Sequence, residues 1–425
     1  METREILERV KKAKAEVMRS DEAARKEALN EMADSLILNI DVILEANKED
    51  LKAAEGRISP VMMDRLRLDE ARIFAMANGI REVAQLPDPV GRVLTRTTRP
   101  NGLEIEKVQV PMGVIAIIYE SRPNVTSDAA SLAIKAGSAC VLRSGRDAHR
   151  SAKAITDAMK AGLKVSSLPE DALFLIDDTS RESAAELMRA RGYVDLLIPR
   201  GGKNLIRSCV EQATVPVLET GTGICHIFVD ASADEQQALS IIENAKCSRP
   251  SVCNAMEVLL LHEAVAPAFF PKLYRRLTAE REARGLTPVR FAADETDLKI
   301  LSSEPEMKYL IPALPEDFDT EHLDYKMTVG IVRDTEEAVR HVNAHSTGHS
   351  ESILTEDRAN AEYFLKNVDS ACVYVNASTR FTDGGEFGFG AEMGISTQKL
   401  HGRGPLGLNE LCTYKYLIRG NGQVR

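Results

Sequence analysis

The sequence predicts an α/β protein in which helices cover parallel sheets, and three observations indicate this fold class. Short apolar runs alternate with longer amphipathic stretches from about residue 113 onward. The runs are about four to seven residues long and the stretches about ten to fifteen, which is the spacing of βαβ units. Two such series follow one another, and a charged two-stranded segment precedes the first. We therefore predict two Rossmann-like three-layer α/β domains and a small β ribbon.

The N-terminal segment, residues 5–86, is expected to be helical. Apolar residues such as Met32, Leu36 and Ile40 recur there at helical spacing. The sequence LPDP at 86–89 then places two prolines where the last of these helices must stop.

A charged hairpin is predicted for residues 93–110. Two extended segments flank Asn101-Gly102, the strongest short signal for a two-residue hairpin turn. The strand-like sequence LCTYKYLI at 411–418 is expected to pair with this hairpin. Because such a ribbon leaves unpaired edges, we expect it to join subunits into a homodimer or a higher homo-oligomer.

The two α/β series set the expected domain boundaries. The first series has the strand-like runs GVIAIIY, ACVLR, ALFLI and VDLLIP, and the second extends over about 256–376. We expect a first domain over 1–244, to which residues 385–410 return. The second domain is expected over 245–384, and residues 411–425 form the C-terminal oligomerisation strand.

Composition and charge restrict the class of partner. The chain has 425 residues, of which 44% are hydrophobic and 5% aromatic, and this fits a globular protein of two or three domains. Its net charge of −10 disfavours nucleic acids and anionic membranes, because both attract basic surfaces. The N-terminal helix is charged and amphipathic, and the longest apolar run, VPMGVIAIIY, is too short to span a membrane. We expect a cytoplasmic protein that acts on a small molecule.

Seven cysteines raise the question of metal or disulfide chemistry; they are at positions 140, 209, 225, 247, 253, 372 and 412. They form no C-x-x-C pair and no Cys/His cluster with zinc spacing, so no metal site is expected. Thiols stay reduced in the cytoplasm, so no disulfide is expected either. Of the three interpretations of CSRPSVCNAM at 247–256, a metal clip, a disulfide or a reactive thiol, the third is favoured.

Two loops after predicted strands have two interpretations each. Gly201 and Gly202 in IPRGGKNLI let a backbone approach an anion at a helix N-terminus, or they form a plain turn, since the G-x-G-x-x-G spacing is absent. Arg143 and Arg146 in VLRSGR offer a phosphate grip, or they are solvated surface charges.

Two polar side chains also follow predicted strands. Asn124 in ESRPNVTSDAA is a natural helix N-cap behind a proline, and the alternative is that its amide points into a cleft at the end of GVIAIIY. Glu219 in VLETGTGICH is either a surface group or a residue next to something that the neighbouring glycines allow to approach closely.

Taken in this order, these segments resemble the aldehyde dehydrogenase superfamily over essentially the whole chain. The resemblance is carried by PMGVIAIIYESRPNVTSDAASLAIKAGSACVLRSG, PVLETGTGICHIFVD, CSRPSVCNAMEVLLLH and RFTDGGEFGFGAEMGISTQKLHGRGPLGLNELCTYKY. Within the superfamily the chain is similar to the acyl-phosphate reductases of proline biosynthesis. The resemblance implies an NADP-binding domain over 1–244 and a catalytic cysteine domain over 245–384.

The resemblance also implies a reaction, the NADPH-dependent reduction of L-glutamyl 5-phosphate to L-glutamate 5-semialdehyde and phosphate. Cys253 matches the nucleophile of the family, which attacks the γ-carbonyl and expels phosphate to leave a thioester. The side-chain amide of Asn124 and the backbone N–H of Cys253 match the donors that hold the oxyanions. Glu219 matches the residue that activates water in aldehyde-oxidising relatives. Reduction does not need that water, so an orienting role around the cysteine is the alternative.

The cofactor is assigned by the same resemblance. The matching cofactor-binding positions are Arg143, Ser144, Gly145, Arg146, Pro199, Arg200, Gly201, Gly202 and Glu219. NAD-preferring relatives commonly place a glutamate in the segment that matches VLRSGR, where it binds the adenine ribose. Arg146 would instead attract a 2′-phosphate, so NADPH is the expected reductant.

Substrate contacts are expected at two places. Glu386, Glu392 and Ser396 match positions where relatives line the substrate mouth, and Arg122 or Arg249 is a candidate for the phosphate. A structural role is the alternative for each of these residues.

Two other functions stay open. An aldehyde-oxidising or CoA-acylating enzyme of the same fold would share Cys253 and Asn124, but ESRPNVTSDAA and CSRPSVCNA disfavour it. A catalytically inactive module that only binds glutamate 5-kinase, the source of the labile acyl phosphate, is disfavoured by the presence of the same two residues. A contact with that kinase in addition to activity stays open. No segment of kinase size precedes residue 1, so a fused kinase is not expected.

Overall fold

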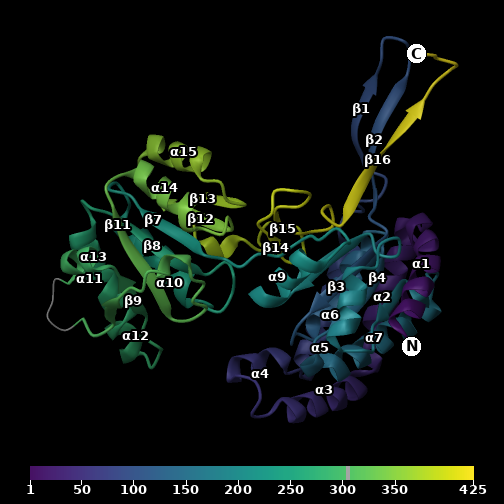
Figure 1. Cartoon of the computed structure of the whole chain (residues 1–425), viewed down its shortest axis with the longest axis horizontal. Coiled ribbons are helices and arrows are strands. Elements are labelled where there is room, and N and C mark those ends of the chain that lie inside the picture. Colours follow the sequence, from purple (N-terminus) through teal and green to yellow (C-terminus); the bar gives the residue numbers. More distant parts are fainter. Residues whose placement is uncertain (303–306) are drawn as a thin grey trace. The chain divides into compact units, whose positions relative to one another are not determined.

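The computed structural model of the chain describes residues 1–302 and 307–425 (Figure 1). The described residues form two compact units. The first comprises Met1–Thr220, Gly388–Gly394 and Leu400–Arg425, and the second comprises the described residues of Gly221–Phe387 and Ile395–Lys399. Each unit has its own parallel sheet and its own hydrophobic core, as the α/β prediction requires. None of the described helices combines the length and the apolar character that a membrane span needs.

Five helices open the first unit, as predicted for residues 5–86. They are α1 (Thr3–Arg19), α2 (Glu22–Leu38), α3 (Ile40–Ala54), α4 (Pro60–Leu66) and α5 (Glu70–Gln85). Asp21 caps α2 and Asp69 caps α5 by accepting hydrogen bonds from backbone N–H groups of the first turn. The chain leaves α5 at Leu86, because a residue that precedes a proline disfavours helical backbone angles.

Four parallel strands form the sheet of the first unit in the order β5-β4-β3-β6. The strands are β3 (Val114–Tyr119), β4 (Ala139–Ser144), β5 (Leu173–Leu175) and β6 (Leu196–Arg200), and their helices are α6 (Asn124–Lys135), α7 (His149–Val165), α8 (Arg181–Met188) and α9 (Lys203–Gln212). The chain steps from β3 outward to β5 and then returns to place β6 on the other side of β3. The carboxyl ends of β3 and β6 therefore meet at the kind of switch point where open α/β sheets bind ligands.

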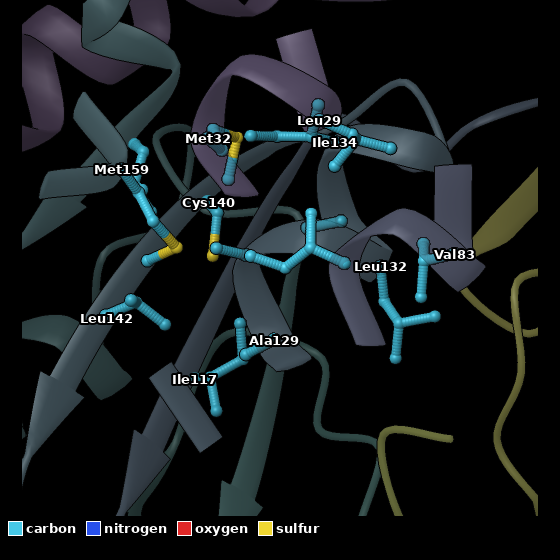
Figure 2. Close-up of a cluster of buried hydrophobic side chains, with 14 of the residues drawn as sticks. Leu29, Met32, Val83, Ile117, Ala129, Leu132, Ile134, Cys140, Leu142 and Met159 are labelled. Atoms are coloured by element: carbon cyan, nitrogen blue, oxygen red, sulfur yellow. The ribbon is translucent and has the colours of Figure 1, made fainter. Parts of the chain in front are cut away.

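Hydrophobic side chains bury both faces of this sheet. Ile115 and Ile117 of β3 pack with α2, α5, α6 and α7, whereas Ala116 and Ile118 pack with α1, α8 and α9. Figure 2 shows part of the first cluster, in which Ile117 and Leu142 of the sheet lie among side chains of α2, α6 and α7. A sheet with helices on both faces needs such near-continuous apolar strands.

Seven parallel strands form the sheet of the second unit in the order β10-β9-β11-β8-β7-β12-β13. The strands are β7 (Cys225–Val229), β8 (Met256–His262), β9 (Arg290–Ala293), β10 (Leu310–Pro312), β11 (Lys326–Val332), β12 (Ser350–Leu354) and β13 (Cys372–Val375). The helices are α10 (Glu235–Cys247), α11 (Ala266–Leu277), α12 (Ala279–Ala283), α13 (Glu295–Leu301), α14 (Thr335–His345) and α15 (Arg358–Asn367). Leu259 of β8 packs with α10, α11 and α13, and Leu260 packs with α14 and α15, so this unit also has three layers.

The border between the units differs from the one expected at 244/245. The strand β7 and the helix α10 belong to the second unit, which begins at Gly221. The reason is strand pairing, since β7 pairs in parallel with both β8 and β12 and is a central strand of the second sheet. The segment 385–410, expected to return to the first domain, is divided, because residues 385–387 and Ile395–Lys399 belong to the second unit. The two-residue strands β14 (Ile395–Ser396) and β15 (Gly404–Pro405) lie in this part of the chain.

The ribbon of the first unit has the order β1-β2-β16 and is antiparallel. Its strands are β1 (Val93–Thr98), β2 (Glu104–Pro111) and β16 (Cys412–Arg419). The predicted turn at Asn101-Gly102 and the predicted pairing of the C-terminal strand are both present, with Gly102 at a φ of 87°. In Figure 1 the ribbon projects away from the helices of its unit. Tyr414, Tyr416 and Ile418 of β16 are exposed.

Candidate active site

The predicted nucleophile, Cys253, lies between α10 and β8 in the second unit. We call residues 248–255 the nucleophile loop. Cys253 is half-buried, and its carbonyl oxygen accepts a hydrogen bond from Sγ of Cys225 (3.2 Å). A Cβ on Gly223 would overlap that same carbonyl oxygen, so only glycine fits there. The glycines after Glu219 predicted that some group approaches the chain closely there. At Gly223 that group is the backbone of Cys253.

The segment after β13 holds the nucleophile loop through Asn254. The buried Asn254 donates from Nδ2 to the carbonyls of Thr382 (2.9 Å) and Arg380 (3.3 Å), and its own carbonyl accepts from Oγ1 of Thr379 (2.8 Å). Arg380 donates from Nη1 to Oδ1 of Asn254 and from Nε to Oγ of Ser248 (3.2 Å). These bonds connect both ends of the loop to one segment that is remote in the sequence.

A buried ion pair closes the base of the nucleophile loop. Lys246 in the last turn of α10 lies 2.7 Å from Glu257 in β8, and both side chains are 0% exposed. The Glu257 carboxylate also accepts from the Leu323 N–H (3.2 Å). Burial raises the pKa of Glu257, and the ammonium of Lys246 opposes that rise. Because the two residues precede and follow the loop, their contact fixes the spacing of its ends.

A chain of buried polar groups extends from Cys225. His349 lies with Nδ1 3.7 Å from Sγ of Cys225 and 2.7 Å from Oγ of Ser350. The Ser350 hydroxyl lies 2.6 Å from Oγ1 of Thr382, which also hydrogen-bonds the Tyr374 hydroxyl (2.7 Å). Burial lowers the pKa of His349 to about 4, so its ring is neutral at pH 7. This chain of polar groups, which reaches the nucleophile loop through the bond from Cys225 to the Cys253 carbonyl, therefore differs from the ion pair at the base of the loop in having a neutral histidine.

The other six cysteines lack the surroundings of a reactive thiol. Five are buried, and Cys247 is half-buried. Burial raises the pKa of Cys209 and of Cys247 to about 11, so both stay protonated at neutral pH. In the described part of the chain no disulfide joins any cysteines, and no group of three His, Cys, Asp or Glu side chains is arranged to hold a metal ion.

The predicted oxyanion donor, Asn124, is the first residue of α6 in the first unit. Of the two interpretations of Asn124, the one in which it caps this helix is wrong, because Pro123 is the N-cap residue and already has helical backbone angles. The exposed Asn124 side chain instead donates from Nδ2 to Oδ2 of Asp128 (3.0 Å). Burial raises the pKa of Asp128 to about 6, against the hydrogen bond from Asn124 and the charge of Arg200. An amide has two N–H groups, so one is left for another acceptor.

Two of the predicted cofactor loops meet at the switch point of the first sheet. Glu120, which follows β3, accepts a hydrogen bond from the Gly202 N–H at the start of α9 (3.0 Å). A Cβ on Gly201 would lie 2.5 Å from the same carboxylate oxygen, and a Cβ on Gly145 would lie 3.4 Å from Cα of Glu120. A carboxylate therefore occupies a position at a helix N-terminus that also suits a phosphate oxygen.

The two arginines of VLRSGR have different surroundings. Arg143 is half-buried, and its Nη2 donates to the carbonyls of Thr179 (2.7 Å) and Ser180 (2.8 Å). Arg146 is exposed in the 3₁₀ turn after β4 and forms no ion pair within residues 1–302 and 307–425. Arg146 is therefore the one whose charge is available to an anion.

The remaining predicted residues divide between the units. Arg122, Ser144, Pro199, Arg200, Glu219 and Glu392 belong to the first unit, and Arg249, Glu386 and Ser396 to the second. Arg200 lies against Gly394, where a Cβ would be 2.5 Å from Nη1. Glu386 is exposed, and its N–H donates to Asp383 (3.3 Å), whereas Ser396 is fully buried. Glu392 and Glu219 are half-buried.

Sequence reasoning missed several polar residues around these positions. Asp128 carried a weak signal, since it follows Asn124 by one helical turn. Glu120 directly follows a predicted strand, as the other candidates do. Arg380 carried no local signal, because 126 positions separate it from Asn254.

A family model for the aldehyde dehydrogenase family matches residues 2–288 and 327–412. The chain therefore belongs to the aldehyde dehydrogenase family and is an oxidoreductase of that family.

Within the family, the chain is similar to proteins named Gamma-glutamyl phosphate reductase. It is 57% identical to the one from Streptococcus gordonii and 58% identical to one from Neisseria meningitidis, in each case over 100% of this chain and 99% of the relative. The crystal structure of Gamma-glutamyl phosphate reductase from Thermotoga maritima matches with a TM-score of 0.94 and 44% identity, over 100% of both chains. The predicted family and fold are confirmed.

Proposed function

We propose that this chain reduces L-glutamyl 5-phosphate to L-glutamate 5-semialdehyde and phosphate with NADPH, through a thioester on Cys253. The observation that carries the proposal is the full-length similarity to proteins named Gamma-glutamyl phosphate reductase, at 57% and 58% identity. The reaction is the second step of proline biosynthesis from glutamate. The many contacts that hold the nucleophile loop support the choice of Cys253.

The chemistry needs a thiolate that both attacks and leaves. The sulfur of Cys253 attacks the γ-carbonyl carbon, the C–O bond to phosphate breaks, and phosphate departs with the electron pair. When bound, NADPH supplies the hydride that reduces the resulting thioester. Cys253 then departs as a thiolate when the thiohemiacetal collapses, and the semialdehyde is released. A thiolate suits both roles because it is a strong nucleophile and a good leaving group.

Each attack on the carbonyl places negative charge on its oxygen. We assign the amide of Asn124 and the backbone N–H of Cys253 as the donors that stabilise this charge. A single donor of this kind lowers the barrier by about 3 kcal/mol. Asp128 supports the assignment, because it accepts one amide hydrogen of Asn124 and leaves the second for the oxyanion.

The first unit offers groups that fit a dinucleotide. The Glu120 carboxylate stands in for a phosphate oxygen at the Gly202 N–H, and the neighbouring Gly201 has no side chain to block a diphosphate. Glu120 must release that N–H before a phosphate accepts it. Arg146 would meet a 2′-phosphate, and its unneutralised charge favours NADPH over NADH.

The other residue assignments follow from the family resemblance. We assign Glu219 an orienting role around the cysteine, because water activation would hydrolyse the thioester. Glu386 and Glu392 are assigned to the substrate ammonium, since their carboxylates suit a cation.

We also propose that the ribbon joins copies of the chain in the cytoplasm, where thiols stay reduced. The exposed Tyr414, Tyr416 and Ile418 on an outer strand support this assembly. Sedimentation velocity that reports only a monomer would contradict it.

The reaction is best tested in reverse, because the acyl phosphate is labile. The protein is mixed with pyrroline-5-carboxylate in equilibrium with glutamate semialdehyde, phosphate, and NADP⁺ or NAD⁺, and absorbance of the reduced nicotinamide is followed. We expect phosphate-dependent reduction of NADP⁺ that falls at least ~10⁴-fold in Cys253→Ala, whereas the matched control Cys247→Ala keeps its activity. Reduction without phosphate would indicate an aldehyde-oxidising enzyme, and no reduction with either cofactor would favour the binding-module function.

A further inference from the structure

Two arginines of the second unit lie in or against the nucleophile loop. Arg249 is exposed near the start of the loop, and Arg380 is half-buried in the turn after β13. The hydrogen bonds of Arg380 reach Ser248 at one end of the loop and Asn254 at the other. Because Asn254 directly follows Cys253, the Arg380 guanidinium lies along the segment that carries the nucleophile.

No carboxylate neutralises these two charges in the described part of the chain. Neither Arg249 nor Arg380 forms an ion pair there, whereas Arg276 of the same unit pairs with Glu243 at 2.7 Å. Asp383 acts on Arg380 electrostatically, but its Oδ1 accepts from backbone N–H groups of the next residues. A partly desolvated guanidinium without a carboxylate is unfavourable, and an anion would relieve it.

The charge of Arg380 also reaches the nucleophile. Burial lowers the pKa of Arg380 and the charge of Arg249 lowers it further, whereas Cys253 acts in the opposite direction. The guanidinium is therefore within electrostatic range of both the second cation and the thiol. Two like charges that form no ion pair in the described part of the chain make a site that a bound dianion would stabilise.

We propose that Arg380, with Arg249 on the solvent side, binds the phosphate group of the acyl-phosphate substrate and the phosphate that leaves. This inference rests on the proposed function. Arg380 uses two of its five N–H groups for Ser248 and Asn254, and the others suit phosphate oxygens. As the sulfur of Cys253 bonds to the carbonyl carbon, the C–O bond breaks and the electron pair passes to phosphate. The negative charge that Arg380 stabilises is therefore largest when the leaving group departs.

The reverse reaction isolates this contact, because phosphate is then a separate substrate with its own KM. We expect Arg380→Gln to raise the KM for phosphate about 10- to 100-fold, the range for a lost charged hydrogen bond. The KM for glutamate semialdehyde should change less than about threefold. Arg380→Lys keeps the charge but loses the planar fork, so its effect should be intermediate. Arg249→Gln should have a smaller effect, because solvent screens an exposed charge.

Arg340→Gln is the matched control. It removes an exposed arginine from α14 in the same unit and should change neither KM. A raised KM for the semialdehyde with an unchanged KM for phosphate would mean that Arg380 holds the α-carboxylate, and would overturn the proposal. Unchanged values for both substrates would leave Arg380 as a structural tie of the loop, and would also overturn it. Arg249→Gln and Arg380→Lys decide the matter if Arg380→Gln fails to fold.

Alkylation of Cys253 gives a second readout that needs no turnover. Iodoacetate is an anion and iodoacetamide is neutral, so the ratio of their rates at Cys253, followed by mass spectrometry, reports the attraction of anions. We expect Arg380→Gln to lower this ratio about tenfold and to abolish protection by inorganic phosphate. Equal ratios in wild type and variant would overturn the proposal. If wild type shows no phosphate-dependent reduction, the proposed function fails, and the ratio still decides whether an anion site lies beside Cys253.

Discussion

The two proposed catalytic groups are held in different ways. Asn124 lies in the first turn of α6, where helix geometry fixes its backbone and one bond to Asp128 orients its amide. Cys253 lies in an irregular loop, and distant parts of the sequence hold it. Gly223 packs against its carbonyl, the segment after β13 bonds its neighbour Asn254, and a buried ion pair closes the base of the loop.

This difference shows how the position of each reacting group is fixed. Local hydrogen bonds fix a side chain on a helix, whereas a loop needs tertiary contacts to reach the same order. A displacement of about 1 Å can change a rate about 100-fold, so both groups must be fixed. We expect changes that loosen the nucleophile loop to lower stability and turnover together. Changes at the start of α6 should lower turnover alone.

The largest effect on stability is expected from Lys246→Met. The variant leaves the Glu257 carboxylate in the core without its cation, which should lower the free energy of unfolding by about 3–5 kcal/mol. Turnover at 25 °C should fall as well, because the ends of the nucleophile loop lose their fixed spacing. Chemical denaturation and the reverse assay measure the two effects.

The double variant Lys246→Met/Glu257→Leu is the control for this prediction. It replaces the ion pair with apolar groups, and such replacements are often close to neutral. Stability should therefore return to within about 1 kcal/mol of wild type. A single variant that loses less than about 1 kcal/mol would show that the pair does not anchor the loop.

The sequence predicted most of what depends on local pattern. The five N-terminal helices, the βαβ alternation and the turn at Asn101-Gly102 follow from periodicity and turn chemistry, and all are present. The border at Gly221 was not predictable in this way, because β7 looks like any buried strand and only its pairing with β8 and β12 assigns it to the second sheet.

Around the site, too, some features follow from local sequence pattern and others depend on tertiary contacts. The Gly223 position was partly predictable, since clustered glycines indicate a close approach. The contacts of Arg380 and the pair between Lys246 and Glu257 form only when the chain folds, and no local pattern indicates them. The capping interpretation of Asn124 was wrong because the proline before it already has helical backbone angles.

Asn124→Ala tests the helical side of the comparison. Loss of one oxyanion donor should lower kcat about 10²- to 10³-fold, because only the transition state uses this hydrogen bond fully. The free energy of unfolding should change by less than about 0.5 kcal/mol, since the side chain is exposed. The matched control Asn78→Ala, at an exposed position of α5, should leave kcat unchanged. Equal kcat values for the two variants would remove Asn124 from the mechanism.

The smallest effect is expected from Asp128→Asn, and its sign depends on pH. Burial raises the pKa of Asp128 to about 6 in the folded chain, above its unfolded value. The folded state therefore binds the proton more tightly, and the stability present at low pH is lost as pH rises through about 6. Asparagine stays neutral and avoids this loss. The variant should be more stable than wild type by about 1 kcal/mol at pH 7.5, after allowance for solvent screening of a half-buried group.

At pH 4 this advantage should largely disappear, because the folded wild-type carboxyl is then protonated and about half of its unfolded form is protonated as well. The exposed control Asp157→Asn should show the opposite sign at pH 7.5, since it only loses a surface pair with Lys153. The asparagine at 128 can still accept from the Asn124 amide through its carbonyl oxygen, so kcat should fall less than about tenfold. A variant that is less stable than wild type at pH 7.5 would mean that the ionised carboxylate stabilises the start of α6. Asn124 would then be held by a charge-assisted hydrogen bond. The start of α6 and the nucleophile loop would then both depend on a charged group for their order.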